Sequence, residues 1–388
     1  MSDDFPIPPD DSASALERGA EWLRGEGECA DVVFSSRVRL ARNLAGMRFA
    51  IKASRADRQQ SLDACREAVM RSGVASGADS RVMWADLHSM GALDRSLLVE
   101  RHLISKPHSK GRGTSPTEDP RGVAISVPDE RLSIMVNEED HLRIQCVRSG
   151  LALSQAWADA DRVDDQVESR LDYAFSERLG YLTACPTNVG TGLRMGVMLH
   201  LPGLRLTGEI EKVKRAADGM SLVVRGFYGE GSEAVGDLFQ ISNQTTLGRS
   251  EVEVLRMLEH DIIPKVVEYE RVSRRELLAK RRIGLEDQVW RAWGELCNAR
   301  LLTTDEAMRA LSMVRLGVVT GLIRAREGSV GEKPGGGGLS AQVVNMLLLM
   351  VQPAHLQRVV GREVNQEQRR VARASLLRRR LGGLAQDR

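Results

Sequence analysis

The chain has 388 residues, of which 42% are hydrophobic and 28% are charged, and its formal net charge is +2 at pH 7. This composition is typical of a globular protein with enough chain for two or three domains, and its small net charge implies no obligatory nucleic-acid partner. No apolar run approaches the roughly 20 residues that span a bilayer. The acidic, proline-rich N-terminus lacks the basic and apolar regions of a secretory signal. We therefore expect a cytoplasmic protein with no membrane partner.

The first part of the chain mixes helix and strand patterns. Residues 1–30 indicate a lead-in with a short helix at 14–25, and an apolar strand follows from residue 31. Apolar residues recur at helical spacing in 57–73 and 93–105. Short apolar runs bounded by turn residues predict six further strands, with one helix among them. The strands lie at 122–127, 132–136, 141–147, 195–204, 221–229 and 237–244, and the helix lies at 161–180.

From about residue 249 the pattern becomes helical. The predicted helices lie at 250–282, 286–298, 304–323, 341–350 and 364–380. The sequence therefore predicts an α+β protein with three parts, namely the lead-in over 1–30, a mixed domain over 31–248 and an all-α C-terminal domain over 249–388.

The five cysteines are scattered along the chain without a CxxC pair. They are Cys29, Cys65, Cys146, Cys185 and Cys297. An odd number at such spacing argues against a disulfide framework and against a zinc site. We expect reduced thiols, and no metal site built from protein ligands.

The stretch SSRVR at 35–39 is the first candidate site. Alternate residues of a strand point to the same side, so Arg37 and Arg39 face together. Two guanidinium groups on one face repel each other unless they meet an anion, and their donors match the oxygens of phosphate. Taken alone, the stretch is either a phosphate site or a solvated strand edge.

The stretch VNEEDHLRI at 136–144 places three carboxylates side by side between apolar runs. They belong to Glu138, Glu139 and Asp140, and Arg143 follows closely behind them. Taken alone, the stretch is either a solvated turn or a site that handles a cation.

Two further clusters combine glycines with arginine. TACPTNVGTGLRMG at 183–196 contains a Cys-Pro turn and Arg194, and RGFYGEG at 225–231 contains a strand-end Arg225 and Glu230. Glycines allow the backbone to approach a ligand closely. Neither a Walker A motif nor a GxGxxG motif in a βαβ unit is present, which argues against a P-loop and a dinucleotide fold.

Taken together, these clusters contain five arginines beside glycine-rich or strand-end segments, with acidic residues nearby. Phosphoryl transfer needs this combination because its catalysis is mainly positioning and electrostatic stabilisation of the transferred group. The metal is then held mainly by nucleotide phosphates and water. The carboxylates would bind a cationic acceptor and remove its proton.

The motifs SSRVR, NEEDHLR, CPTNVGTGLR and RGFYGEG occur in this order in the phosphagen (ATP:guanido) kinases, and the chain resembles that superfamily over roughly 35–248. Within it, the chain is most similar to the bacterial protein arginine kinases. LVERHLIS at 98–105 and QPAHLQR at 352–358 look like that subfamily, and residues 1–34 are too few for the N-terminal domain of the small-molecule kinases. The resemblance implies a catalytic domain with an antiparallel sheet flanked by helices, and phosphorylation of arginine side chains in proteins.

The resemblance also implies a set of site residues. The five arginines would clamp the phosphates of ATP, which binds with Mg²⁺, and His102 would pack near the adenine. Glu139 matches the catalytic base, Glu230 the carboxylate that orients the guanidinium, and Cys185 the reactive cysteine. The implied ATP site comprises Ser35, Ser36, Arg37, Val38, Arg39, His102, Arg143, Arg194, Met195, Gly196, Val197, Met198, Arg225, Gly226, Phe227, Tyr228, Gly229 and Glu230.

One departure from the subfamily lies near the C-terminus. The subfamily carries an RDxxRA motif that binds phosphoarginine, and the matching stretch here is RRVARA at 369–374. Arg369, Arg373 and Ala374 match the motif, whereas Arg370 stands where an aspartate is expected. Two interpretations stay open, a site that still grips a phosphate and a basic, solvated helix face.

By resemblance, the partners would be protein substrates with exposed arginines, a zinc-binding activator protein, a Clp ATPase and a second copy of the chain in a homodimer. The modification would mark proteins for Clp-type degradation or regulate a stress repressor. Two alternatives stay open, a kinase for a free guanidino compound and a catalytically weak adaptor of a Clp unfoldase.

Overall fold

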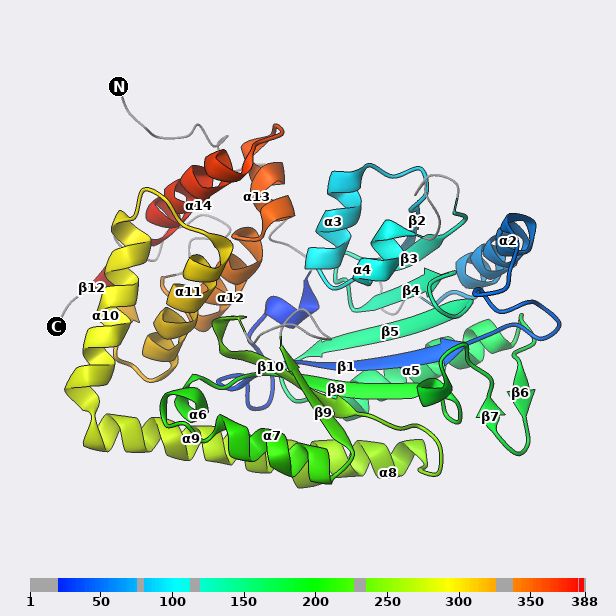
Figure 1. The fold of residues 1–388 in the computed structure, drawn as a ribbon, viewed down its shortest axis with the longest axis horizontal. Coiled ribbons are helices and arrows are strands. Elements are labelled where there is room, and N and C mark those ends of the chain that lie inside the picture. Colours follow the sequence, from blue (N-terminus) through cyan, green and yellow to red (C-terminus); the bar gives the residue numbers. More distant parts are fainter. Residues whose placement is uncertain are drawn as a thin grey trace.

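The computed structural model describes residues 20–74, 80–111, 119–226, 235–325, 338–382 and 384–386. In this part of the chain, eight strands form one antiparallel sheet in the order β2-β3-β4-β5-β1-β8-β10-β9 (Figure 1). These strands are β1 (Val33–Arg42), β2 (Arg81–Asp86), β3 (Gly122–Val127), β4 (Leu132–Val136), β5 (Leu142–Ser149), β8 (Leu193–His200), β9 (Leu222–Gly226) and β10 (Leu238–Asn243). The predicted α+β class with an antiparallel sheet is confirmed.

The two faces of the sheet differ in polarity, as β1 shows. Val38 and Leu40 are buried, whereas Arg37 and Arg39, which alternate with them, are partly exposed. The apolar face packs against a layer of helices that supplies most of one hydrophobic core. These helices include α2 (Arg55–Arg71), α5 (Leu153–Glu168) and α9 (Ile263–Lys280). The arginines lie on the opposite face, where Met135, beside Arg143, and Val147, beside Arg37, belong to two other apolar clusters.

The predicted helix at 250–282 is present as one nearly continuous rod along the bottom of Figure 1. It consists of α8 (Glu251–Arg256), a π-helical turn (Met257–Ile262) and α9. Ser250 begins it with a capping box that also uses Glu253. The π-helical turn lies directly before Pro264, which has no backbone N–H to donate within a helix.

The C-terminal helices pack at one end of the sheet (Figure 1). They are α10 (Arg282–Asn298), α11 (Thr304–Val319), α12 (Ala341–Met350), α13 (Pro353–Val360) and α14 (Gln366–Leu381). Apolar side chains of α10, α11, α12 and α14 share one core with Phe34, Met198 and Leu238 from the sheet and with Trp22 from a short 3-10 turn (Glu21–Leu23). The helical part therefore rests directly on the strands that carry the arginines.

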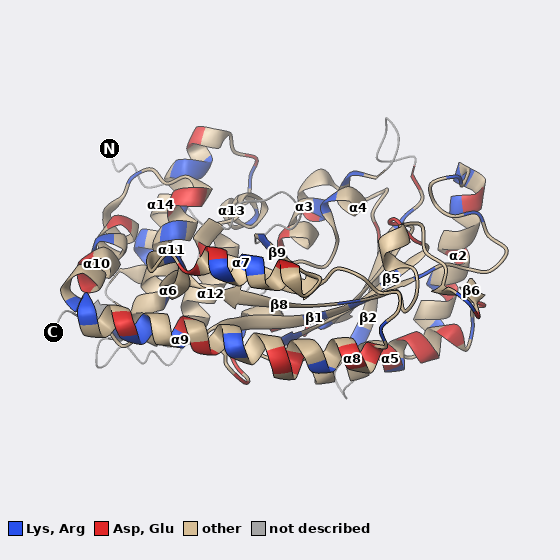
Figure 2. Ribbon diagram, turned by 60° about the horizontal axis from the view of Figure 1, so that its bottom comes forward, with Lys and Arg blue, Asp and Glu red and all other residues tan. Residues whose placement is uncertain are grey.

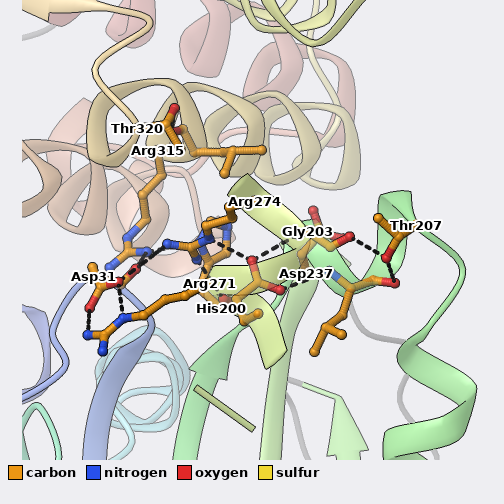
Figure 3. A network of polar contacts seen from close by, with 12 residues as sticks. Asp31, His200, Gly203, Thr207, Asp237, Arg271, Arg274, Arg315 and Thr320 are labelled. Carbon is orange, nitrogen blue, oxygen red and sulfur yellow. Dashed lines mark hydrogen bonds and ion pairs between the residues drawn. The ribbon is translucent and has the colours of Figure 1, made fainter. Parts of the chain in front are cut away.

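A buried polar network reinforces this junction (Figure 3). Arg315 of α11 donates to the carbonyls of Ala30 and Asp31, at 2.9 and 3.1 Å, and to His200 Nδ1 at 2.9 Å. Arg274 of α9 also donates to the His200 carbonyl, at 3.1 Å. Since Arg315 and His200 are fully buried, each donor and acceptor here needs its partner.

The predicted helix at 161–180 is displaced toward the N-terminus. Helix α5 ends at Glu168, and the chain then forms a hairpin of β6 (Phe175–Ser176) and β7 (Gly180–Tyr181). Contacts with distant segments fix both boundaries, because the Ala152 N–H donates to the Ser36 hydroxyl and the Ala174 N–H donates to the Asn43 carbonyl. Local helical spacing carries no information about such partners.

The elements that were not predicted include β2, α7 (Ile210–Gly219) and α13, and the strand predicted at 195–204 ends at His200. Of the helix predicted at 14–25, residues 14–19 lie outside the described residues, and Glu21–Leu23 form the 3-10 turn. Acidic and basic residues alternate along α9, as Figure 2 shows, in keeping with the small net charge. Within the described ranges, no single helix is long and apolar enough to span a bilayer, and only α12 with α13, bent by 85°, qualifies as a pair.

Candidate active site

Strand register places five arginines on one face of the sheet. They are Arg37, Arg39, Arg143, Arg194 and Arg225. The cross-strand pairs that establish this are Arg39–Arg194, Arg37–Gly196, Ala41–Arg143, Ser35–Met198, Met198–Gln240 and Gln240–Arg225. Directly paired residues point to the same side of a sheet, and so do alternate residues of one strand. Four strands therefore present positive charge to a common region.

The arginines strongly perturb one another. Burial, with repulsion from Arg143 and Arg194, lowers the pKa of Arg37 from 12.5 to about 10. Burial and the neighbouring guanidinium groups, first among them Arg37, lower the pKa of Arg39 even more. A bound polyanion would relieve this repulsion, so the face is suited to the phosphates of a nucleotide.

Gly196 keeps the centre of this face open. A Cβ atom at this position would lie 2.9 Å from Gln240 Nε2 and 3.1 Å from the Cβ of Ser242. Gln240 is itself held by Arg37, whose Nη2 donates to Gln240 Oε1 at 3.0 Å. A side chain at position 196 would therefore displace the residues that fix Arg37.

A small pocket adjoins the arginine face at the end nearest the C-terminal helices. It is lined by Trp22, Ser35, Arg37, His102, Val147, Gly196, Met198 and Gln240. His102 has φ +60°, and its carbonyl accepts a hydrogen bond from Gln145 Nε2 at 2.7 Å. Its ring meets Trp22 edge-on, with centroids 5.0 Å apart. Burial, with Arg37 nearby, lowers the pKa of His102 to about 3, so the ring is neutral at pH 7.

The NEED turn between β4 and β5 is rigidly held. Asn137 has φ +62° and is buried. Its side-chain amide donates to the carbonyls of Arg58 and Pro120, at 2.7 and 2.9 Å, and accepts from the Ser61 hydroxyl at 2.8 Å. These bonds connect the turn to α2 and fix the direction of the next three side chains.

Glu138 points inward and serves the arginine face. Its carboxylate accepts from Arg143 Nη1 at 3.0 Å, from the Ser105 hydroxyl at 2.6 Å and from the Glu139 N–H at 2.9 Å. Burial alone would raise the pKa of this carboxyl, but Arg143 and the two hydrogen bonds lower it to about 2. Glu138 is therefore a charged anchor for Arg143.

Asp140 joins two separate parts of the site. Its Oδ1 accepts from Asn43 Nδ2 and from the Ala184 N–H, both at 2.6 Å, and its side chain is buried. Asn43 follows β1, and Ala184 directly precedes Cys185. Burial raises the pKa of Asp140, and the two hydrogen bonds oppose that shift. The carboxyl thus connects the NEED turn to the cysteine loop.

Glu139 differs from its two acidic neighbours because it is only partly buried, whereas Glu138 and Asp140 are buried. His141 is also buried, with Nδ1 accepting from the Leu44 N–H at 3.1 Å and Nε2 lying 3.1 Å from the Arg48 carbonyl. This pairing describes a neutral, structural histidine. Of the acidic residues of the turn, Glu139 is the most exposed.

The cysteine loop is anchored on both sides. A 3-10 turn (Pro186–Asn188) follows Cys185, whose Sγ lies 3.0 Å from the hydroxyl oxygen of Thr187. The Thr246 hydroxyl contacts the carbonyls of Thr187 and Val189, at 3.0 and 2.7 Å. The thiol is partly exposed. It is therefore placed on a fixed loop next to the NEED turn.

The remaining predicted site residues divide into three groups. Ser36, Val38, Met195 and Val197 are buried in the strands, where they build the sheet rather than its open face. Arg225 and Gly226 end β9. Phe227, Tyr228, Gly229 and Glu230 lie outside the described residues.

The RRVARA stretch lies on α14, far from the arginine face in sequence. Arg373 is buried, and its Nε and Nη1 donate to the carbonyls of Val351 and Leu302, both at 2.8 Å. Arg369 Nη1 donates to the Val364 carbonyl at 2.8 Å, and the Arg370 carbonyl accepts from the Leu302 N–H. Ala374 is fully buried. Arg373 thus holds the corner between α12 and α13.

Five residues that support the site carry no local sequence signal. Trp22, Asn43, Ser105, Gln145 and Gln240 each contact a candidate residue that is distant in the chain. Over the described ranges, no group of three or more His, Cys, Asp or Glu residues is arranged to hold a metal ion. The arginines supply cationic donors that match the oxygens of phosphate.

Comparison with known proteins agrees with this geometry. The family model for the ATP:guanido phosphotransferase C-terminal catalytic domain matches residues 65–273, and that for the protein-arginine kinase McsB C-terminal domain matches residues 282–388. The chain is 48% identical over 362 residues to a protein-arginine kinase of Symbiobacterium thermophilum, which covers 93% of this chain and 96% of the relative. The chain belongs to the protein-arginine kinase family. A second family member, from Bacillus licheniformis, is 42% identical over 362 residues and 93% of each chain.

Solved structures extend the comparison to the fold. A lombricine kinase is 26% identical, with a TM-score of 0.52 over 70% of this chain and 72% of that one. The duplicated taurocyamine kinase of Schistosoma mansoni gives a TM-score of 0.53 over 70% of this chain and 37% of that one, at 24% identity. The phosphagen-kinase-like fold is therefore shown, and the resemblance to the superfamily is confirmed.

Proposed function

We propose that this protein transfers the γ-phosphoryl group of ATP to arginine side chains of proteins. The observation that carries the proposal is the single sheet face with five arginines, bordered by the partly exposed Glu139. Family membership supplies the acceptor class. ATP would bind together with Mg²⁺. The phosphates would hold most of this ion's coordination, and the ion would add positive charge beside the arginines.

The reaction forms a P–N bond. A guanidinium nitrogen of the substrate attacks the γ-phosphorus while the bond from that phosphorus to the β–γ bridging oxygen breaks, and ADP departs. The nitrogen loses a proton in this step, and Glu139 accepts it. A guanidinium has a pKa above 12, so a carboxylate fixed against it is needed to expose the attacking lone pair.

Other residues position these groups. The arginines on β1, β5, β8 and β9 hold the phosphates and stabilise the charge that develops on the transferred group. We also assign Cys185 and Glu230 to the acceptor site. Both assignments rest on the family pattern. Glu138 and Asp140 act through Arg143 and the cysteine loop.

We extend the proposal to the cellular role that the family resemblance implies. The protein would act in the cytoplasm as a homodimer and modify proteins with exposed arginines. The mark would direct them to a Clp-type ATPase or control a stress repressor, with a zinc-binding protein as activator. The RRVARA stretch is proposed as the phosphoarginine site, which requires Arg373 to release its carbonyl partners.

Mass spectrometry tests the proposed activity. The protein is incubated with ATP and Mg²⁺, in separate reactions with an arginine-rich protein and with free arginine, and samples are kept from acid to preserve P–N bonds. We expect phosphoarginine in the protein. Phosphate found only on free arginine would indicate a small-molecule kinase, and no transfer to either acceptor would contradict the proposal.

A further inference from the structure

Two segments that are far apart in the chain meet at the junction between the sheet and the C-terminal helices. One is residues 98–105, at the end of α3 (Ala92–Glu100), and the other is residues 352–358, at the start of α13. Glu100 Oε1 accepts from the Ala354 N–H at 2.7 Å, and Oε2 accepts from the His355 N–H at 2.9 Å. His355 Nδ1 lies 2.7 Å from the same Oε2. One carboxylate thus binds three nitrogen atoms some 250 residues away in the chain.

These contacts make Glu100 the N-terminal cap of α13. The first backbone N–H groups of a helix have no partner within it, and the side chain of Gln352, the residue at the cap position, makes no capping hydrogen bond to them. A carboxylate at this end also interacts favourably with the helix dipole. Glu100 is only 8% exposed and His355 only 1%. These contacts therefore restrain both the end of α3 and the start of α13.

Arg101, the next residue, forms further contacts at this junction. Arg101 Nη1 lies 3.4 Å from Nε2 of His355, whose other ring nitrogen contacts Glu100. Arg101 Nε also donates to both oxygens of Glu130, at 2.9 Å each. Both side chains that precede His102 are thus buried and fixed from two directions.

These contacts restrain the backbone conformation of His102. Its φ of +60° is uncommon for a residue other than glycine and persists only where the surroundings impose it. The same residue lines the pocket beside Arg37 and packs edge-on against Trp22. Its carbonyl accepts from Gln145, which pairs with Arg39 across the strands. Movement of the end of α3 would therefore reach the nucleotide pocket directly.

We propose that Glu100 is a positioning residue through which α13 holds His102 in the nucleotide pocket, so that the C-terminal helices set the affinity for ATP. This inference rests on the proposed function, because it takes the pocket to be the nucleotide site. Glu100 touches neither the phosphates nor the acceptor. Its loss should weaken ATP binding and leave the chemical step nearly unchanged.

Glu270 offers a matched control. Its buried carboxylate also caps a helix from elsewhere in the chain, because it accepts from the Gly203 and Leu204 N–H groups of α6 (Pro202–Leu206), both at 2.9 Å. Within the described part of the chain, Glu270 forms no contact with residues 100–102. Glu270→Ala should cost stability in the same way as Glu100→Ala without reaching His102.

Calorimetric titration with ATP in the presence of Mg²⁺ tests the inference on the full chain. For Glu100→Ala we expect a Kd for ATP raised roughly tenfold, with kcat at saturating ATP within about twofold of wild type. Glu100→Gln keeps one acceptor oxygen and should give a smaller rise. Glu270→Ala should leave the Kd within about twofold of wild type.

The inference fails if Glu100→Ala and Glu270→Ala change the Kd equally, or if kcat falls while the Kd stays constant. His355→Ala keeps both backbone N–H contacts and provides a milder variant if Glu100→Ala does not fold, with an expected rise of about threefold. An unchanged Kd in that variant would also overturn the inference. Phosphotransfer by the wild type is measured in parallel, so a failure of the proposed function is recognised separately.

Discussion

Glu138 and Glu139 are adjacent carboxylates with opposite surroundings. Glu138 is buried and ion-paired with Arg143, whereas Glu139 is partly exposed. The hairpin turn produces this difference, because successive side chains leave it in different directions. Two glutamates that are neighbours in the chain therefore have different roles.

The pKa of Glu138 gives a pH-dependent prediction. A pKa lowered to about 2 from 4.5 means that the native state favours the carboxylate more than the unfolded state does. Its contribution to the free energy of unfolding is fully present above about pH 4.5 and is lost as the pH falls toward 2. Glu138→Gln should be less stable than wild type at pH 6, and the difference should shrink on acidification. Urea unfolding at several pH values measures it, and a constant difference would contradict the assignment.

Asp140 gives a prediction about hydrogen bonding rather than charge. Because a single oxygen accepts both hydrogen bonds, Asp140→Asn can keep them, whereas Asp140→Ala frees the cysteine loop. We expect kcat near wild type for Asp140→Asn and a loss of roughly tenfold to hundredfold for Asp140→Ala. Steady-state phosphotransfer decides between this account and one in which the negative charge itself is required. In the latter case, both variants would be equally impaired.

Strand β1 illustrates what the sequence predicts at the scale of an element. Its alternation of arginine with apolar residues indicated both the strand and the shared direction of Arg37 and Arg39, and the structure agrees. Helix α5 shows the limit, because its ends depend on Ser36 and Asn43, which lie more than 100 residues away. Local sequence patterns also cannot predict the two hydrogen-bond partners of Asp140.

The arginine face predicts a conflict between stability and function. Since the positive charges on β1, β5, β8 and β9 repel one another, Arg39→Gln should stabilise the ligand-free protein by about 1 kcal/mol. The same substitution should abolish the increase in melting temperature that ATP gives the wild type. Thermal unfolding with and without ATP measures both effects. A destabilised Arg39→Gln variant would show that repulsion does not dominate at this position.

At the scale of the whole molecule, the helical part and the sheet are joined by buried polar groups as well as by apolar packing. Arg315 and Arg274 reach from α11 and α9 to the backbone that precedes β1, and Glu100 reaches from α3 to α13 (Figures 1 and 3). The two matched family regions therefore form a single body around the arginine face. Local periodicity predicted the C-terminal helices but gave no sign of how they dock on the sheet.

Removal of Arg315 tests this docking. Arg315→Met would leave the Ala30 carbonyl, Asn345 Oδ1 and His200 Nδ1 without this donor in the interior, and should cost about 3 to 5 kcal/mol of unfolding free energy. Arg291 is exposed and pairs with Asp287 in its own helix, so Arg291→Met is the control and should leave the free energy of unfolding nearly unchanged. Denaturant unfolding measures both. Equal effects would mean that the network contributes little.

In the proposed reaction, the arginine face holds ATP and Glu139 accepts the proton of the arginine side chain that is phosphorylated. The most direct measurement is single-turnover transfer from labelled ATP to an arginine-rich protein, comparing wild type with Glu139→Gln under conditions that preserve P–N bonds. We predict phosphoarginine with the wild type and a rate at least about 100-fold lower with Glu139→Gln, while both bind ATP with similar Kd. Transfer at the wild-type rate by Glu139→Gln, or label on serine or threonine in place of arginine, would contradict the account.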